Sequence, residues 1–223
     1  MVRVKICGIT NLEDARASID AGAYALGFNF YPPSPRYIEP SAARRIIDQL
    51  PASILCVGVF VNLPDAEQVK RVASDAGVQA VQLHGDESPE YCQNLKDIFV
   101  IKALRVNSEF EPERAARYET EAILLDGFSP VAFGGVGQRF DWSVAMRTRE
   151  LVGKLFLAGG LNADNVAAAI KLVQPYAVDA CSGLESIPGR KDMVKVRAFI
   201  AAALEASSQT ATGLEAGSSE FNL

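Results

Sequence analysis

Apolar and polar residues alternate with a period of two at the start of the chain and then change to a helical period. Val2, Val4 and Ile6 are separated by two basic residues, which predicts a strand with one apolar face. Gly8 ends this strand, and the segment 11–21 that follows has apolar residues spaced as on one face of a helix. The start of the chain therefore predicts one strand followed by one helix.

The same unit repeats along the chain. Further strands are expected at 25–30, 54–61, 80–83, 99–103, 122–125, 155–158 and 177–180. Further helices are expected at 40–49, from 62–64 to about 76, from 88–90 onward, and at 111–118, 142–151, 162–173 and 193–205. Alternation of this kind implies an α/β fold with parallel strands and right-handed helical crossovers. Eight units close most naturally into a (βα)8 TIM barrel, a single domain. An open doubly wound sheet is the alternative, but it usually has a G-x-G-x-x-G after its first strand, which is absent here.

The composition changes at residue 207. Residues 207–223 are rich in Ser, Thr, Gly and Glu, which predicts a disordered C-terminal tail behind a barrel domain that spans 1–206. No apolar run reaches the length of a membrane span, and the N-terminus lacks the layout of a signal peptide. We therefore expect a cytoplasmic protein with no membrane partner.

Charge and cysteine spacing exclude several classes of protein. The net charge of −5 argues against nucleic acid as a partner. No C-x-x-C pair occurs, the single histidine has no metal ligand at a suitable spacing, and no G-x-S-x-G is present. We therefore expect no metal site and no serine-hydrolase triad. Reduced thiols are typical of the cytoplasm.

Residues able to do chemistry gather at the carboxyl ends of the predicted strands. Cys7, His84, Asp126 and Asp179 end the first, fourth, sixth and eighth strands or lie close to those ends. In a parallel barrel these ends share one rim, where ligands bind. Arg36 follows the second strand between prolines, and a fixed guanidinium suits a carboxylate ligand. We assign substrate binding to the arginine, the histidine and the last aspartate. Taken singly, each residue also has a structural reading, such as a small buried thiol or a turn aspartate.

Two glycine-containing loops follow the seventh and eighth strands. Gly159 and Gly160 end the seventh strand, and Ser182 and Gly183 follow the eighth. Barrels often hold a phosphate at this position. Backbone N–H groups, the serine hydroxyl and a helix N-terminus would supply the donors.

A series of motifs connects these positions. They are K-I-C-G-I-T (5–10), G-F-N-F-Y-P-P-S-P-R (27–36), V-G-V-F-V-N (57–62), V-Q-L-H-G (81–85), L-L-D (124–126), G-G-V-G-Q-R-F-D-W (134–142), L-A-G-G-L (157–161), S-G-L-E (182–185) and P-G-R-K-D (188–192). In this order they resemble the phosphoribosylanthranilate isomerase family. The resemblance covers the chain up to about residue 192 and leaves the tail uncovered.

The resemblance implies a cofactor-free aldose–ketose isomerase of tryptophan biosynthesis. Such an enzyme converts N-(5-phosphoribosyl)anthranilate to 1-(2-carboxyphenylamino)-1-deoxyribulose 5-phosphate by an Amadori rearrangement. By resemblance, Cys7 is the general base, Asp126 is the general acid and Arg36 holds the anthranilate carboxylate. Phosphate binding falls to the glycine loops, including Gly135. The partner is a small sugar phosphate, and the chain is expected to be a monomer or a homodimer.

Two residues depart from the family pattern, and two rival functions remain. Val136 stands where the family often has threonine, and Cys181 precedes Ser182 where the family often has a second serine. The analogous isomerase of histidine biosynthesis is similar in fold and chemistry but uses aspartate where Cys7 stands. A barrel that only binds a sugar phosphate or a protein is the other alternative.

Overall fold

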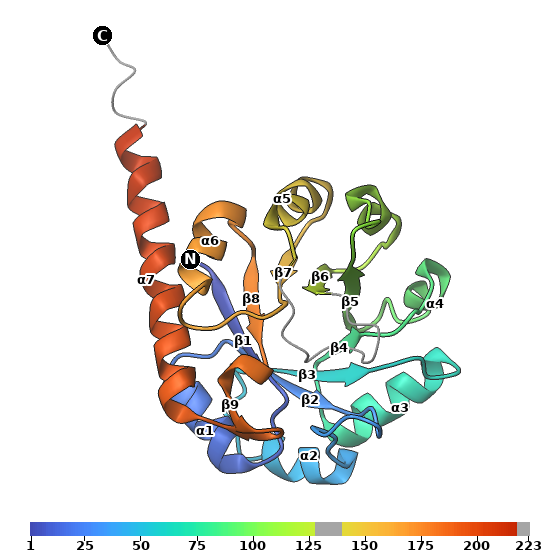
Figure 1. The fold of residues 1–223 in the computed structure, drawn as a ribbon. Coiled ribbons are helices and arrows are strands. Elements are labelled where there is room, and N and C mark those ends of the chain that lie inside the picture. Colours follow the sequence, from blue (N-terminus) through green and yellow to red (C-terminus); the bar gives the residue numbers. More distant parts are fainter. Residues whose placement is uncertain (128–139, 218–223) are drawn as a thin grey trace.

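The computed structural model describes residues 1–127 and 140–217, and in this part of the chain eight strands form one closed parallel barrel (Figure 1). The strands are β1 (Arg3–Cys7), β2 (Ala25–Asn29), β3 (Leu55–Phe60), β4 (Ala80–Leu83), β5 (Phe99–Val106), β6 (Ala122–Gly127), β7 (Leu155–Leu157) and β8 (Ala177–Ala180). Each strand pairs with its neighbour in sequence, and β8 pairs with β1 to close the barrel. The predicted (βα)8 barrel is confirmed.

Helices surround the barrel on its outside (Figure 1). They are α1 (Leu12–Asp20), α2 (Pro40–Ile47), α3 (Ala66–Ala76), α4 (Pro89–Gln93), α5 (Trp142–Leu151), α6 (Val166–Val173) and α7 (Met193–Gly217), with the 3₁₀ helices η1 (Pro112–Arg117) and η2 (Ser182–Leu184). A two-stranded hairpin of β9 (Glu185–Ile187) and β10 (Arg190–Lys191) follows η2. The sequence pattern did not predict this hairpin.

Three helices differ from their expected form for local reasons. The carboxylate of Asp65 accepts a hydrogen bond from the Gln68 N–H at 2.8 Å, so α3 begins after this cap and not near residue 62. Asn62 itself has a φ of 50° and cannot continue into a helix. The segment expected as a helix at 111–118 is the 3₁₀ helix η1, and α6 begins at Val166 and not at residue 162.

The last helix continues beyond the point where the composition changes. α7 runs to Gly217, and Figure 1 shows it beside the N-terminus. The backbone N–H of Val2 donates to the Ser207 hydroxyl at 2.7 Å, and Ser207 is buried. The helix thus includes the first residues of the segment that the composition predicts as a tail.

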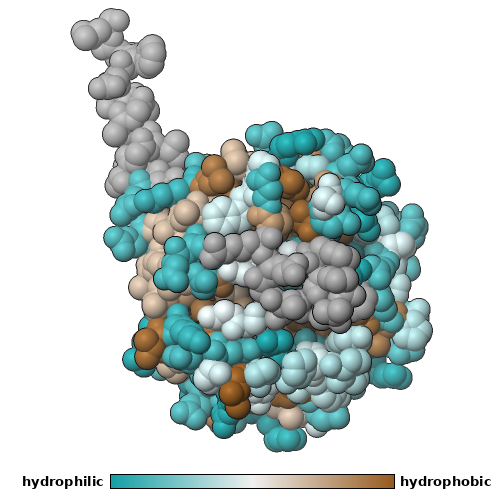
Figure 2. All heavy atoms as spheres, in the orientation of Figure 1, coloured by the Kyte–Doolittle hydropathy of each residue, from teal (hydrophilic) through white to brown (hydrophobic). Residues whose placement is uncertain are grey.

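Two apolar regions lie on either side of the barrel wall. The larger one fills the space between the strands and the helices, and the smaller one lies inside the barrel around Phe156 and Leu124. Charged residues are also buried on both sides of the wall. The fully buried Lys5 points into the barrel, whereas the fully buried Lys102 alternates with the interior residues Ile101 and Ala103 and points outward. On the face shown in Figure 2, hydrophilic residues cover most of the described surface and hydrophobic ones occur singly or in small groups. None of the described helices is long and apolar enough to cross a membrane.

Candidate active site

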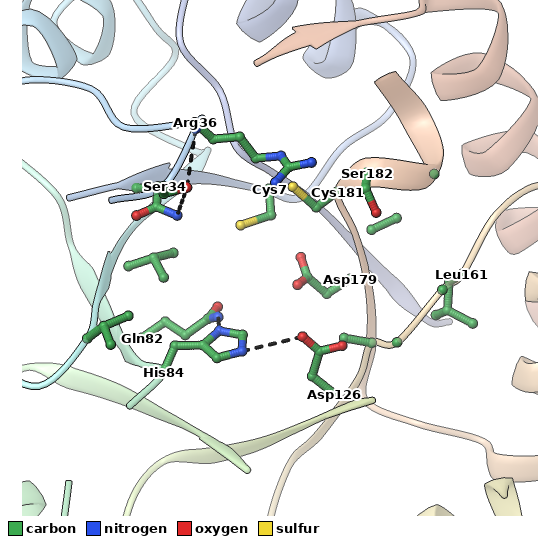
Figure 3. A pocket seen from close by; sticks show the side chains of 18 residues that line it. Cys7, Ser34, Arg36, Gln82, His84, Asp126, Leu161, Asp179, Cys181 and Ser182 are labelled. Atoms are coloured by element: carbon green, nitrogen blue, oxygen red, sulfur yellow. Dashed lines mark hydrogen bonds and ion pairs between the residues drawn. The ribbon is translucent and has the colours of Figure 1, made fainter. Parts of the chain in front are cut away.

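A pocket at the carboxyl ends of the strands collects the predicted site residues (Figure 3). Nine of the ten line this one pocket: Cys7, Arg36, His84, Asp126, Gly159, Gly160, Asp179, Ser182 and Gly183. They come from strands or loops that are far apart in the sequence, and closure of the barrel brings them to one rim. Gly135, like Val136, lies outside the described residues.

The thiol of Cys7 is set up to ionise. Cys7 ends β1 next to Cys181, because Ile6 and Ala180 are paired in the register of β1 and β8. A hydrogen bond with the Cys181 thiol lowers the pKa of Cys7 well below its usual range, against the effect of burial, and the charges of Lys5 and Lys191 add to this. The surroundings of Cys7 therefore favour the thiolate, which is the form that acts as a base.

The other three thiols stay protonated. Burial raises the pKa of Cys56 to about 12 and that of Cys92 to about 11. The hydrogen bond with Cys7, together with burial, raises the pKa of Cys181 well above its usual range. Cys181 is thus the donor and Cys7 the acceptor in this pair.

Asp126 faces the pocket from the opposite side, next to His84 (Figure 3). One carboxylate oxygen accepts from the Gly127 N–H at 2.8 Å, and the other lies 3.4 Å from His84 Nε2. The Gln82 amide nitrogen lies 2.8 Å from His84 Nδ1, so with the amide assigned as donor the ring proton is on Nε2 and faces Asp126. β6 continues to Gly127, so Asp126 is the last but one residue of the strand and not the residue that follows it.

Arg36 is held by a carboxylate that the sequence did not single out. Its Nε lies 2.9 and 3.1 Å from the two Glu185 oxygens, and its Nη2 lies 2.7 Å from one of them. Lys191 Nζ reaches the same carboxylate at 3.2 Å. Nη1 of Arg36 makes no hydrogen bond among the described residues and remains available to a ligand. The arginine is therefore fixed in place before any substrate binds.

The loops after β7 and β8 form a glycine-lined wall. Gly159 and Gly160 have φ values of 86° and 66°, a backbone region that favours glycine. A Cβ on Gly183 would lie 2.7 Å from the Leu161 carbonyl oxygen, so only glycine lets the two loops approach this closely. The Gly160 N–H has no backbone acceptor among the described residues. The expected helix N-terminus here is the three-residue helix η2, which is too short to add a helix dipole.

Asp179 is occupied by a partner inside the barrel. Its carboxylate accepts from the Lys5 ammonium at 3.0 Å, in a pair that is almost fully buried. Burial raises the pKa of Asp179 to about 6, although Lys5 opposes the shift. Asp179 lines the pocket floor, but its first partner is the lysine.

Four residues in or beside the pocket were not singled out as site residues from the sequence, and one of them, Gln82, lines the pocket. Lys5 and Gln82 are polar residues inside short apolar strands, and that contrast was the signal available for them. Glu185 and Lys191 lie in the unpredicted hairpin, and nothing in their local pattern marked them. No group of three or more His, Cys, Asp or Glu residues within the described ranges could hold a metal ion.

Comparisons with known proteins match the chain over almost its full length. A family model described as N-(5′-phosphoribosyl)anthranilate (PRA) isomerase matches residues 4–202. A protein of that name from Pelobacter propionicus is 50% identical over 210 residues, which cover 94% of this chain and 99% of the relative.

Solved structures of enzymes with this name match both the fold and the sequence of the chain. The crystal structure of phosphoribosyl anthranilate isomerase from Thermotoga maritima has a TM-score of 0.86 at 50% identity and covers 92% of this chain and 100% of its own. The enzyme of that name from Thermus thermophilus has a TM-score of 0.85 at 39% identity, covering 92% and 99%. A further structure, at 48% identity and a TM-score of 0.83 and covering 92% and 100%, holds the isomerase with reduced 1-(o-carboxyphenylamino)-1-deoxyribulose 5-phosphate. A chain with this barrel, this rim pocket and these matches belongs to the family of N-(5′-phosphoribosyl)anthranilate isomerases.

Proposed function

We propose that the rim pocket of this chain converts N-(5′-phosphoribosyl)anthranilate to 1-(2-carboxyphenylamino)-1-deoxyribulose 5-phosphate, a step of tryptophan biosynthesis, with Cys7 as general base and Asp126 as general acid. One observation carries the assignment of roles. A thiol with a lowered pKa and a carboxylic acid face the same pocket from opposite sides (Figure 3). An Amadori rearrangement needs one base and one acid on a substrate held between them.

The acid acts first. Asp126 in its protonated form gives a proton to the ring oxygen of the ribose, the bond from C1′ to that oxygen breaks, and the nitrogen lone pair forms an iminium. His84 Nε2 lies 3.4 Å from the carboxylate and makes no hydrogen bond among the described residues, so it is a close neighbour of the acid and not its hydrogen-bond partner. The Gly127 N–H fixes the other oxygen at 2.8 Å.

The base acts on the open-chain iminium. The Cys7 thiolate takes the proton from C2′, and the electron pair of that bond moves through C1′ to neutralise the iminium nitrogen. The product is an enolamine, which becomes the ketone when C1′ gains a proton and the C2′ hydroxyl loses one. The thiol formed at Cys7 is the source of a returning proton. No cofactor is required by this sequence of proton transfers.

The two ends of the substrate are anionic, and the pocket has donors for both. We assign the anthranilate carboxylate to Arg36, whose Nη1 is free of the Glu185 pair. We assign the phosphate to the wall formed by Gly159, Gly160, Ser182 and Gly183. Contacts with the carboxylate at one end and the phosphate at the other would hold C2′ and the ring oxygen of the substrate between Cys7 and Asp126.

We propose a small sugar phosphate as the partner, no nucleic acid, and a cytoplasmic location suited to free thiols. A structure among the matches is described as a monomeric form of the dimeric Thermotoga maritima isomerase. For this chain, a monomer or a homodimer remains the expectation.

Turnover of freshly prepared phosphoribosylanthranilate, followed by loss of its fluorescence, tests the proposal. Cys7→Ala and Asp126→Asn should each lower kcat by about 100-fold or more, because each removes a proton-transfer group. Both should still bind the reduced product analogue. The matched controls Cys56→Ala, at a buried thiol of β3, and Asp86→Asn, at an exposed carboxylate after β4, should keep kcat.

Three outcomes would contradict the proposal. Near-normal kcat in Cys7→Ala or Asp126→Asn would remove that residue from the mechanism. Binding of the analogue without turnover in the unaltered protein would indicate a barrel that only binds a sugar phosphate. Turnover of the histidine-pathway substrate in place of phosphoribosylanthranilate would favour the rival isomerase.

A further inference from the structure

A fully buried lysine lies directly beneath the Cys7 thiol. Residues two apart on a strand share a face, so Lys5 and Cys7 both point into the barrel from β1. Lys5 is 0% exposed, and its ammonium lies 3.0 Å from Asp179. A Cβ built on Gly27 of the neighbouring strand would lie 2.6 Å from Cys7 Sγ and 3.1 Å from Lys5 Nζ. The absence of a side chain at Gly27 thus leaves the thiol and the ammonium side by side.

The charges around Cys7 leave one positive charge without a carboxylate partner. Arg36 and Lys191 both bond to the single carboxylate of Glu185. Lys5 bonds to Asp179. In these direct ion pairs three cations share two carboxylates, and all of these groups are buried or nearly so. The remaining carboxylate of the pocket, Asp126, lies on the far side against His84. A buried cluster with an uncompensated charge is costly, and a thiolate at Cys7 would neutralise it.

We propose that Lys5 is a positioning residue that keeps Cys7 in its thiolate form, with Asp179 holding the ammonium charged and aimed at the sulfur. The proposal rests on the role of Cys7 as general base in the proposed function. In this proposal Asp179 acts through Lys5 and Cys7 and does not contact the substrate. The proposal also explains why a barrel interior built of apolar side chains contains a lysine below the base.

The acid–base properties of the two groups agree with this placement. Burial alone would lower the pKa of Lys5, but the charges of Asp179 and Cys7 and hydrogen bonds to both raise it, so the ammonium stays charged. The hydrogen bond with Cys181 and the charges of Lys5 and Lys191 lower the pKa of Cys7. The groups around Cys7 come from five parts of the chain. They are Lys5 of β1, Arg36 in the loop after β2, Asp179 of β8, Cys181 directly after β8, and Glu185 and Lys191 of the hairpin.

Removal of the ammonium should change the thiol in a defined direction. A nearby positive charge favours the thiolate, so its loss raises the pKa of Cys7. An ordinary thiol has a pKa of about 8.5 and is only a few per cent thiolate at neutral pH. The kcat of a Lys5 variant should therefore fall at pH 7 and recover as the pH rises toward 9. A residue with only a structural role would lower kcat without such a recovery.

The test is the pH dependence of Cys7 alkylation by iodoacetamide in the full chain, read from the Cys7 peptide by mass spectrometry. This readout separates Cys7 from Cys181. The unaltered protein should show a midpoint below that of a free thiol. Lys5→Met should move the midpoint upward by at least about one pH unit, which is a tenfold slower reaction below both midpoints. The pH profile of kcat should move the same way.

Lys102→Met is the matched control. Lys102 is also a fully buried lysine on a barrel strand, paired with Glu87 at 2.7 Å. It belongs to β5, points away from the barrel interior and is absent from the groups that influence Cys7. This variant loses a buried ion pair of the same kind, so it reports on structural damage. Because Lys102 does not influence Cys7, the alkylation midpoint of this variant should stay within about 0.3 pH units of the unaltered protein. A shift of that size corresponds to only about 0.4 kcal/mol, since one pH unit is about 1.4 kcal/mol.

Two results with these variants would overturn the proposal. One is a Lys5→Met midpoint equal to that of the unaltered protein, and the other is an equal shift in Lys102→Met. If Lys5→Met does not fold, Lys5→Gln replaces it. A midpoint at or above about 8.5 for Cys7 in the unaltered protein would refute the proposal without any variant. Alkylation needs no substrate, so the result is independent of the proposed function. Conversely, a Cys7→Ala variant with normal turnover would refute the base role while leaving the alkylation midpoints unaffected.

Discussion

At the scale of the residue, the site consists of charges that are paired before the substrate arrives. Glu185 accepts from both Arg36 and Lys191, and Asp179 accepts from Lys5. Bonds made in advance lower the cost of ordering long side chains when the substrate binds. They also leave free the atoms that the substrate needs, such as Nη1 of Arg36.

Arg36→Met should raise KM more than it lowers kcat. The contact of the guanidinium with the anthranilate carboxylate is present in the ground state and in the transition state, so it contributes mainly to uniform binding. Steady-state kinetics at constant pH measure this split. Arg190→Met is the control, because Arg190 is an exposed arginine of the hairpin whose Glu185 holds Arg36. This variant should change neither constant. An unchanged KM in Arg36→Met would show that the carboxylate binds elsewhere.

At the scale of the element, the hairpin after β8 and the last helix add to what the eight β/α units supply. The hairpin places Glu185 at its start, where it holds Arg36 of the pocket, and Lys191 at its end, where it bonds to the same carboxylate. Its turn contains Gly189 with a φ of 81°, and Thr10 Oγ1 donates to the Gly189 carbonyl. α7 lies against the start of β1 through Ser207. The hairpin and the last helix therefore both make contacts with the start of the chain.

The stability of the chain should depend on where α7 is cut. A chain that ends after Ser207 should keep its melting temperature and activity. A chain that ends after Glu205 loses the buried Ala206 and the acceptor for the Val2 N–H. An unsatisfied donor costs about 1–3 kcal/mol, which for a chain of this size lowers Tm by roughly 2–4 °C per kcal/mol.

Thermal unfolding of the two truncated chains, compared with the full chain, provides the measurement. Equal melting temperatures for both truncations would show that the Ser207 contact adds nothing. A loss of several degrees on cutting after Ser207 would show that residues beyond it pack on the barrel.

At the scale of the whole molecule, ions are buried outside the barrel wall as well as inside it, and Lys102 is the outer example. Lys102 donates to the carbonyls of Leu83 and Gly85 and to the carboxylate of Glu87, at 2.7–3.1 Å. Glu87 in turn accepts from the Asn62 N–H at 2.8 Å. This network links the ends of β3, β4 and β5, below one part of the rim. Rigid support of this kind keeps the acid side of the pocket in place.

Lys102→Met should destabilise the barrel strongly. It leaves the Glu87 carboxylate buried without its cation, and breaking such a pair costs about 3–5 kcal/mol. The double variant Lys102→Met/Glu87→Gln removes the unpaired charge and keeps an acceptor for the Asn62 N–H. Its melting temperature should therefore lie above that of the single variant. Equal melting temperatures would show that the charge of Glu87 is not what the lysine compensates.

Much of the fold could be predicted from the sequence because its signals are local. A strand with apolar residues at every second position and a helix with one apolar face need only their own residues, so the order of the eight units is readable. The ends of the strands follow from the same pattern, and with them the positions of Cys7 and Asp126. Caps were less predictable, and α3 begins at Asp65 because a side-chain hydrogen bond, not a pattern, sets that end.

The tertiary structure decided which of those residues meet and in what state. Cys7 and Cys181 are 174 positions apart in the chain, and only the register of β1 against β8 makes them neighbours. The Arg36 to Glu185 pair spans 149 positions and depends on a hairpin whose short strands carry no periodic signal. The sequence by itself therefore determined the elements and the residue types at their ends, since these depend on local period and turn chemistry. The ionisation of the thiol and the orientation of its neighbours depend on burial and on charges brought together across the closed barrel, which no local pattern encodes.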